Sequence, residues 1–173
     1  MAKAAESDAI ALLKADHRKV ESLFAKFERA NSADQKSELA KQICTELTVH
    51  TTIEEEIFYP ACQEAIKDEE MVNEAFVEHD GAKVLVTEIE AGRPSEQFYD
   101  AKVSVLSEMI KHHVKEEEKR GEGLFAKARA AGLDLEDLGA RMAARKEQLM
   151  AQFESKGLPR PEMRTMTAMS AAE

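Results

Sequence analysis

Two histidine-glutamate pairs stand within otherwise apolar helical stripes, and they constrain the fold more than any other feature of the chain. One stripe consists of Ile43, Leu47, His50, Glu54, Ile57 and Ala61, and the other of Leu106, Ile110, His113 and Glu117. Spacings of three or four residues place each stripe on one face of a helix. An ionisable pair in a core stripe costs free energy unless it has a partner, so the interior must supply one.

The pairs belong to an internal repeat. A lone histidine, His17, precedes His50 by 33 positions, and His79 precedes His113 by 34. Each repeat therefore reads as a helical hairpin with a single histidine on its first helix and a His-x-x-x-Glu pair on its second. The lone histidines lie about ten residues after their helix starts, and the paired ones about ten before Pro60 and Gly123, a common depth of roughly 15 Å. Helices that alternate in direction would bring all four histidines to one level.

The apolar periodicity predicts an all-α fold, an up-down-up-down four-helix bundle with an additional C-terminal helix. The four expected helices cover residues 7–29 with Ser7 as N-cap, 32–67 with a kink at Pro60, 69–91 closed by Gly92, and 95–120 beginning at Ser95. Asp134 can cap the fifth helix, which ends near Phe153. The expected domains are the bundle over 7–131, an appended helix over 132–156 and a flexible tail over 157–173.

Buried glutamates need a compensating cation, and no lysine or arginine stands at a matching position in these stripes. Residues four apart project from the same helix face, so each pair can direct an imidazole nitrogen and a carboxylate oxygen at one point. Four imidazoles and two carboxylates exceed what one tetrahedral zinc ion uses, but they suit two octahedral ions bridged by the carboxylates. The predicted cofactor is two non-haem iron ions with an oxo or hydroxo bridge. Ferritin-like sites use Glu-x-x-His and more carboxylates, so the spacing argues against that class.

Helical phase selects the predicted ligands, which are His17, His50, Glu54, His79, His113 and Glu117. His112 is turned about 100° from the stripe that His113 continues, so we expect it beside the site or at the surface. The other glutamates near the pairs are expected on a solvated acidic face; they are Glu55, Glu56, Glu116 and Glu118. The alternative is a plain bundle whose core histidines bond to glutamates, but an apolar core would be at least as stable.

Four strings, LLKADHRKVESLF, HTTIEEEIFYP, EHDGAKVL and HHVKEEE, together resemble the hemerythrin-like HHE domain family over roughly residues 9–131. The resemblance implies metal ligation by the same six residues. Annelid-type hemerythrins have five histidine ligands, two of them on the third helix, whereas Ala75 stands here one turn before His79. A Leu-Phe-Pro motif usually follows the second pair. This chain has Leu124-Phe125-Ala126, about three residues late, which predicts either a bulge in the fourth helix or an extra turn.

A formal net charge of −10 opposes binding to phosphate backbones or anionic lipid, so we expect neither nucleic acid nor membrane as a partner. No apolar run approaches the roughly 18 to 20 residues of a spanning helix, and the start of the chain lacks a signal-peptide pattern, so the expected location is cytoplasmic. Cys44 and Cys62 lie 18 positions apart in one expected helix, which excludes a disulfide between them. We expect both to be small buried or half-buried side chains.

Three functions suit such a centre. The favoured hypothesis is binding or sensing of O2 or nitric oxide at an open iron position, with a protein partner engaged through the C-terminal helix. The alternative is an enzyme that decomposes peroxide or reduces O2 in oxidative-stress defence. The third is iron handling, in which the ions themselves are the cargo.

Overall fold

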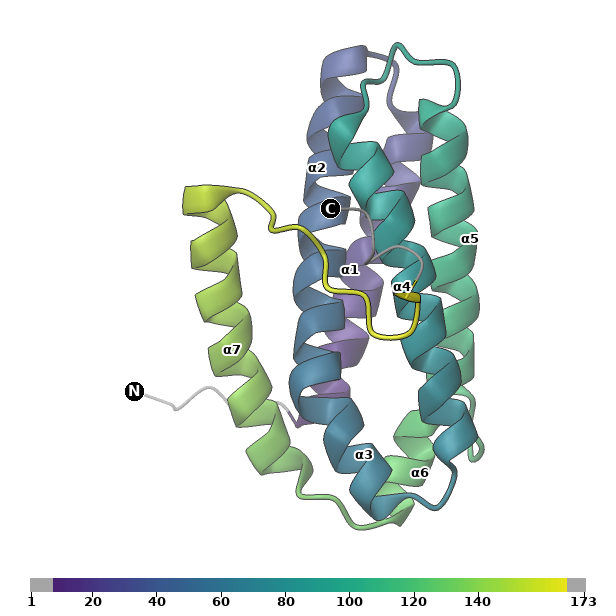
Figure 1. Ribbon diagram of the computed structural model, residues 1–173, viewed down its shortest axis with the longest axis vertical. Coiled ribbons are helices and arrows are strands. Elements are labelled where there is room, and N and C mark those ends of the chain that lie inside the picture. Colours follow the sequence, from purple (N-terminus) through teal and green to yellow (C-terminus); the bar gives the residue numbers. More distant parts are fainter. Residues whose placement is uncertain (1–7, 168–173) are drawn as a thin grey trace.

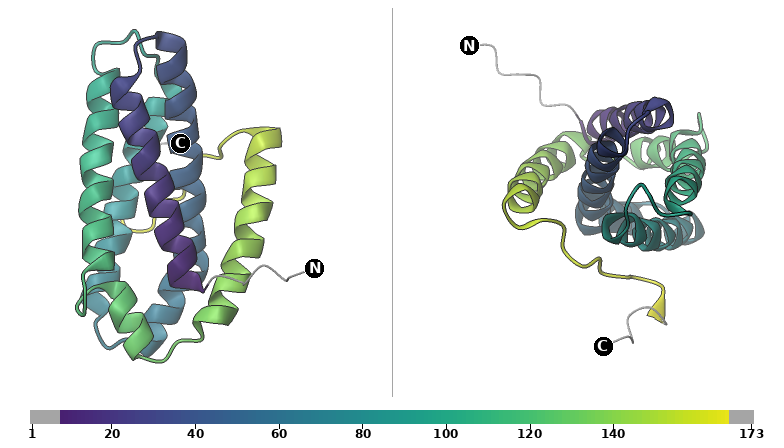
Figure 2. Two further views of the ribbon diagram at one scale, coloured as in Figure 1. Left: turned by 180° about the vertical axis from the view of Figure 1, so that it is seen from behind. Right: turned by 90° about the horizontal axis from the view of Figure 1, so that it is seen from above.

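A computed structural model describes residues 8–167, in which all regular secondary structure is helical. Four long helices run alternately up and down; they are α1 (Ala9–Arg29), α2 (Ala33–Ile53), α4 (Glu69–Ala91) and α5 (Tyr99–Glu118) (Figure 1). Seen from above, the four surround a common axis (Figure 2). The predicted four-helix bundle is confirmed.

Helix starts follow their capping residues. The Asp8 side chain accepts a hydrogen bond from the backbone N–H of Ala11 at 2.8 Å, so Asp8 is the N-cap of α1. The cap that we predicted at Ser7 lies outside the described residues. At the second helix, Ser32 caps as predicted and accepts from the N–H of Gln35 at 3.2 Å.

The fourth helix of the bundle starts later than predicted. Ser95 was the expected first residue, but α5 begins at Tyr99. Between α4 and α5 the backbone forms tight turns, in which the N–H of Glu96 bonds to the carbonyl of Arg93 at 2.9 Å and that of Tyr99 to Glu96 at 3.2 Å. Pro94 favours such a turn because its ring fixes one backbone angle and offers no N–H.

The second helix is not a kinked α-helix that reaches residue 67. A π-helical turn, η1 (Glu54–Phe58), interrupts it, and α3 (Tyr59–Ala65) completes it. The distortion therefore precedes Pro60, where we had predicted a kink. In a regular α-helix the Pro60 ring would meet the carbonyl of Glu56, and the wider turn that contains Glu56 relieves this clash.

The appended helix, α7 (Leu135–Lys156), lies outside the bundle against α1 and α2 (Figure 2). A short helix, α6 (Leu124–Ala130), connects it to α5. Asp134 caps α7 as predicted and accepts from the N–H of Asp137 at 3.0 Å. Leu138, Met142 and Phe153 of α7 are buried against the bundle.

The chain after α7 returns to the bundle. We predicted a flexible tail over 157–173, but residues 157–167 pass over α2 and α4 (Figure 1), while residues 168–173 lie outside the described range. The buried Asp80 anchors this segment, because its carboxylate accepts the backbone N–H groups of Arg164, Thr165 and Met166 at 3.0, 2.6 and 3.1 Å. Lack of helical periodicity had suggested disorder, whereas hydrogen bonds to one buried side chain hold the segment in place.

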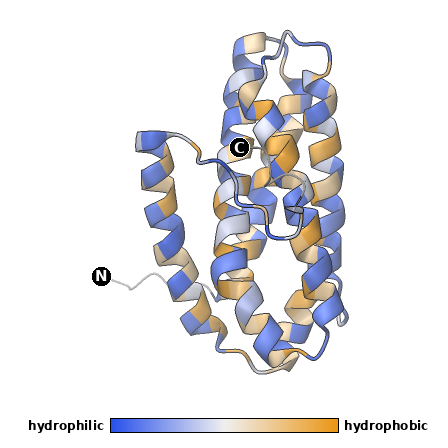
Figure 3. Ribbon diagram, in the orientation of Figure 1, coloured by the Kyte–Doolittle hydropathy of each residue, from blue (hydrophilic) through white to orange (hydrophobic). Residues whose placement is uncertain are grey.

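The bundle interior consists of two apolar clusters on either side of one polar layer. Along α1, Leu13 belongs to the first cluster and Val20 to the second, with His17 between them. Figure 3 shows hydrophilic and hydrophobic residues mixed along the helices. Among the described residues, no helix has the length and apolar character needed to cross a membrane.

Candidate metal centre

The structure brings the six predicted ligands together in the polar layer, and each is at most 5% exposed. The Nε2 atoms of His17 and His50 lie 3.2 Å apart, and those of His79 and His113 also lie 3.2 Å apart. The imidazoles therefore form two pairs, one between α1 and α2 and one between α4 and α5. This is the convergence that the repeat and the alternating helix directions predicted.

Each glutamate connects the two histidine pairs. The Glu54 Oε2 atom lies 3.2 Å from the Nε2 atoms of both His50 and His79. The Glu117 Oε2 atom lies 3.4 and 3.5 Å from the Nε2 atoms of the two remaining histidines. Each carboxylate thus faces one histidine of either pair and could contribute an oxygen to a cation bound there.

Ligand atoms of His17, His50, Glu54 and Glu117 lie within 4.8 Å of one another, and so do those of Glu54, His79 and His113. These two groups share Glu54. The centre therefore offers two adjacent groups of metal-ligating side chains that have one carboxylate in common.

Two carboxylate oxygens in this layer support the presence of a cation. Glu54 Oε1 and Glu117 Oε2 are buried, and no group in the described part of the chain donates a hydrogen bond to either. A buried carboxylate oxygen without a donor is costly, since it has lost its water and gained no partner. Metal ions would compensate both oxygens, so the donor set fits such ions.

Four additional carboxylates contact the outer nitrogens of the histidines, and helical phase did not predict them. The pairs, with the distance from Nδ1 to the carboxylate oxygen, are His50 with Asp16 (3.5 Å), His17 with Glu118 (2.7 Å), His79 with Glu55 (3.0 Å) and His113 with Glu78 (2.7 Å). Each carboxylate comes from the neighbouring segment around the bundle, so the contacts form a closed ring. An Nδ1–H that donates to a carboxylate leaves Nε2 free to face a metal.

For two of these carboxylates, the prediction that they lie on a solvated acidic face was wrong. Glu55 is only 7% exposed and the Glu118 side chain 19%, whereas Glu56 and Glu116 are exposed as expected. One signal was present in the sequence, because each of the four carboxylates directly adjoins a predicted ligand. Each of these carboxylates nevertheless contacts the Nδ1 atom of a histidine on another helix, and helical phase alone does not predict contacts between helices.

The appended segments neutralise part of this ring. Lys146 of α7 forms an ion pair with Asp16. Arg164 of the returning segment lies 3.3 Å from Glu55, which Lys83 of α4 also contacts at 2.8 Å. Cations from outside the bundle therefore balance two of the outer carboxylates, Asp16 and Glu55, whereas the inner glutamates depend on the centre itself for compensation.

Tyr59 is a further residue in the centre that we did not predict. Its hydroxyl oxygen lies 3.2 Å from Glu54 Oε2, 3.0 Å from Glu117 Oε1 and 3.1 Å from His79 Nε2. In a regular α-helix Tyr59 would be turned about 140° from Glu54. The wider π turn brings it onto the same face and replaces the predicted inner positions Ile57 and Ala61, which are only partly buried.

The segment between Glu117 and Leu124 has neither of the two forms that we predicted for it, a bulge in the fourth helix or an extra helical turn. The helix α5 has neither a bulge nor an extra turn beyond Glu117, since it ends at Glu118. The chain folds back closely, and a Cβ on Gly123 would lie 2.4 Å from the Glu117 carbonyl oxygen. Phe125 then stacks on His17, with ring centroids 5.8 Å apart. His112 lies at the surface, with its side chain 65% exposed.

Electrostatics in the centre favour positive charge. Burial lowers the pKa of His50, but the carboxylates of Glu54 and Asp16 outweigh it and raise the pKa to about 10. Burial likewise raises the pKa of Glu54, but His50 and His79 reverse this and hold it well below its usual range. Carboxylates that retain a proton on an imidazole also attract a metal cation, so proton and metal compete for the same nitrogen.

A buried layer of four histidines and two glutamates inside an antiparallel bundle defines a helical metal-binding protein. The sequence profile of the hemerythrin HHE cation binding domain matches residues 8–128, and the chain belongs to this family. The expected family membership is confirmed.

Two proteins resemble this chain, one in structure and one in sequence. A crystal structure of a hemerythrin HHE cation binding domain-containing protein from Mycobacterium kansasii superposes with a TM-score of 0.69 at 25% identity, covering 88% of this chain and 95% of that one. A protein named DNA nickase from Nostoc sp. is 31% identical over 118 residues, which is 68% of this chain and 32% of the nickase. The chain therefore spans about a third of the length of that relative.

Proposed function

We propose that the centre holds two iron ions bridged by Glu54 and Glu117 and that it binds O2 or nitric oxide. A cavity of about 10 Å³ carries this proposal, because it lies against all four histidines and its exposed surface is apolar. Its other walls include Val20 and Ile110. Such a space has room for roughly one water-sized molecule and suits an uncharged ligand better than an ion.

The coordination arithmetic supports an open position for that ligand. Two imidazoles and two bridging carboxylates give each ion four donors from the chain, and an octahedral iron ion takes six. Bound iron would supply the ligand-binding and redox chemistry. The outer carboxylates hold each imidazole in orientation, and the apolar clusters on both sides exclude bulk water.

Tyr59 favours a second candidate, the decomposition of peroxide or reduction of O2. Burial, together with the charges of Glu117 and Glu54, raises the pKa of Tyr59 well above its usual value, so the phenol retains its proton. Such a hydroxyl is too weak an acid to be the proton source for O–O cleavage, but it lies 3.1 Å from His79 Nε2 and can donate a hydrogen bond to O2 or peroxide in the centre.

A protein partner that engages α7 is a further proposal. A protein partner at α7 would meet the polar face of this helix, because its apolar residues Leu138, Met142 and Phe153 already pack against the bundle. A net charge of −10 opposes binding to a phosphate backbone, which argues against DNA as a partner of this chain.

The ligand assignment is tested by His113→Ala, with the adjacent His112→Ala as matched control. His113 is 4% exposed and contacts Glu117, whereas the His112 side chain is 65% exposed. We expect His113→Ala to lose most bound iron and to melt at a lower temperature, and His112→Ala to retain both properties. Equal iron content in the two variants would contradict the assignment.

Spectra after exposure to O2 separate the two candidate functions. An O2-dependent absorption band that disappears when O2 is removed supports reversible binding. Repeated consumption of hydrogen peroxide, with a lower rate in Tyr59→Phe at unchanged iron content, supports the enzyme instead.

A further inference from the structure

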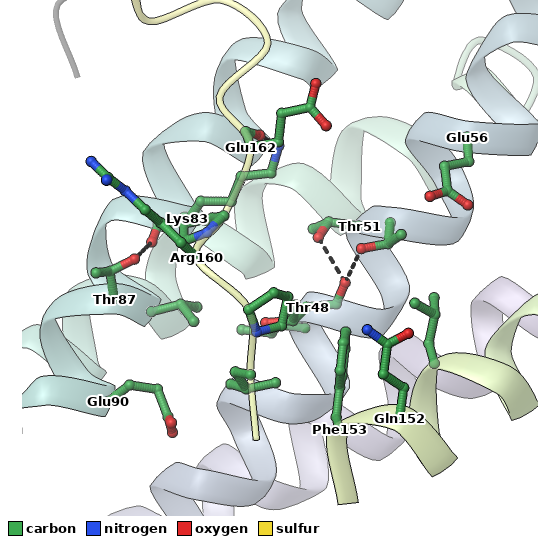
Figure 4. Close-up of a pocket in the computed structure, with 18 of the residues that line it drawn as sticks. Thr48, Thr51, Glu56, Lys83, Thr87, Glu90, Gln152, Phe153, Arg160 and Glu162 are labelled. Atoms are coloured by element: carbon green, nitrogen blue, oxygen red, sulfur yellow. Dashed lines mark hydrogen bonds between the residues drawn. The ribbon is translucent and has the colours of Figure 1, made fainter. Parts of the chain in front are cut away.

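A larger pocket lies outside the metal centre, between α2, α4, α7 and residues 158–162 (Figure 4). Its volume is about 590 Å³, within the range of small-molecule sites. The pocket exists because α7 diverges from α2 toward its C-terminal end, and the chain beyond Gly157 crosses back over the gap (Figure 1). Gly157 permits this turn with a φ of 76°.

The inner surface of this pocket is largely apolar. Its walls include Leu47 and Val86 from the bundle, Leu149 and Phe153 from α7, and Leu158 from the returning segment. In Figure 4, Phe153 and Gln152 face the pocket from α7, opposite Thr87 and Glu90 of α4.

Charged groups at the rim already have partners within the protein. Arg145 binds Glu56 with nitrogen-oxygen distances of 2.7 and 2.9 Å. Lys83 contacts Glu55 at 2.8 Å and the carbonyl oxygen of Glu162 at 2.8 Å. Glu90 also lines the pocket, and burial raises the pKa of its carboxyl. Because Arg145 and Lys83 are already paired and most of the walls are apolar, the pocket suits uncharged molecules.

Leu47 and Thr51 line both this pocket and the small cavity against the histidines. They stand one turn apart on α2 and are 3% and 5% exposed. The Thr51 hydroxyl donates to the carbonyl oxygen of Thr48 at 3.3 Å, so its proton is used within α2. Two side chains therefore separate the large pocket from the space beside the metal centre.

A second cleft also reaches the metal centre, and its walls are more acidic than those of the larger pocket. It lies between α4 and α5, has a volume of about 40 Å³, and is lined by Glu74, Glu78 and Glu116 beside His113. The cleft also has apolar walls from Met71, Ala75 and Leu124, but its carboxylates attract cations and hold water, so it suits an uncharged diatomic molecule less well than the larger pocket.

We propose that uncharged diatomic ligands collect in the pocket between α2, α4 and α7 and reach the metal centre between the side chains of Leu47 and Thr51. This inference rests on the proposed binding of O2 or nitric oxide. Apolar solutes partition from water into apolar space, so the pocket raises their concentration next to the centre. Passage requires rotamer changes of two side chains on one helix, with no displacement of the helix itself.

Association kinetics test the passage. Leu47→Ala removes most of one of the two side chains that separate the pocket from the centre. We therefore expect the rate constant for nitric oxide binding to the diferrous protein, measured by stopped flow, to rise about fivefold or more. Val20→Ala is the matched control, because Val20 lines the same cavity from α1 and does not line the pocket. Equal rate constants in wild type, Leu47→Ala and Val20→Ala would overturn the passage. Leu47→Val provides a milder test, with a smaller acceleration, if the alanine variant does not fold.

Xenon provides a readout that does not depend on iron or on any variant. Crystals of the wild-type protein under xenon pressure should show xenon against Leu47 and Phe153, and xenon absent from this pocket would overturn the inference. The proposed function and the access route can be refuted separately. A wild-type protein that binds iron but neither O2 nor nitric oxide refutes the proposed function, whereas normal binding with an empty pocket and unchanged rates refutes only the access route.

Discussion

Replacing Glu55 by glutamine should weaken one of the two metal positions and largely spare the other. Glu55 Oε1 lies 3.0 Å from His79 Nδ1, and His79 shares a ligand group with Glu54 and His113 but not with His17. Glutamine retains the shape of the side chain and removes its charge. The imidazole then loses a charged acceptor that fixes its orientation and raises its basicity.

The size of the effect follows from this contact. Loss of a carboxylate partner to a ligating histidine lowers metal affinity by about 10- to 100-fold, or roughly 1.4 to 2.8 kcal/mol. Lys83 keeps a second carboxylate partner in Asp80 at 3.2 Å, so the substitution does not leave its charge without a counter-ion. We therefore expect a protein that folds and binds one iron ion with nearly normal affinity and the second more weakly.

Competition with a ferrous chelator, monitored for both equivalents of iron, measures this difference. Glu56→Gln is the matched control, since Glu56 is the adjacent residue and pairs with Arg145 at the surface. Retention of both affinities in Glu55→Gln, or equal losses in both variants, would refute the reasoning that the outer carboxylates position the ligands.

Three further predictions concern protons, thiols and the returning segment. Iron loading should release protons and strengthen with rising pH, because iron must displace the proton of His50. Burial lowers the pKa of His50, but Glu54 and Asp16 outweigh it and raise this pKa to about 10. Iron loading that is constant between about pH 6 and pH 8 would contradict this prediction. Neither Cys44 nor Cys62 should react with a thiol reagent at about pH 8 before denaturation, because both are 0% exposed and burial raises the pKa of Cys62 to about 12; rapid labelling of the native protein would be the opposite result. Asp80→Asn should increase hydrogen exchange in residues 164–166 because one acceptor oxygen is lost, whereas unchanged protection would show that other contacts hold the segment.

The repeat of histidines in the sequence was sufficient to predict the bundle and the convergence of six side chains. His17 and His79 lie at equivalent depths in two hairpins, and the alternation of helix direction then determines the rest. The choice of His113 over His112 followed from helical phase, and the structure shows the first buried and the second exposed. Local periodicity therefore predicts a site well wherever the helices are regular.

The residues that the sequence did not reveal lie where regularity ends or where contacts cross between helices. Tyr59 enters the centre only because a π turn shifts the helical phase after Glu54, and no hydrophobic pattern marks that shift. Glu55 and Glu118 adjoin ligands but contact histidines on other helices, which depends on how neighbouring helices are rotated. The segment after Gly157 is placed by hydrogen bonds to the single residue Asp80, so periodicity carried no information about it.

Iron content per chain, determined together with the optical spectrum of protein purified without chelators, tests the central claim most directly. The geometry of Glu54 and Glu117 between two histidine pairs predicts two iron ions per chain and near-ultraviolet bands from an oxo-bridged ferric pair. A chain that binds no iron after anaerobic reconstitution with ferrous salt, or only one ion held by both pairs together, would contradict a dinuclear centre.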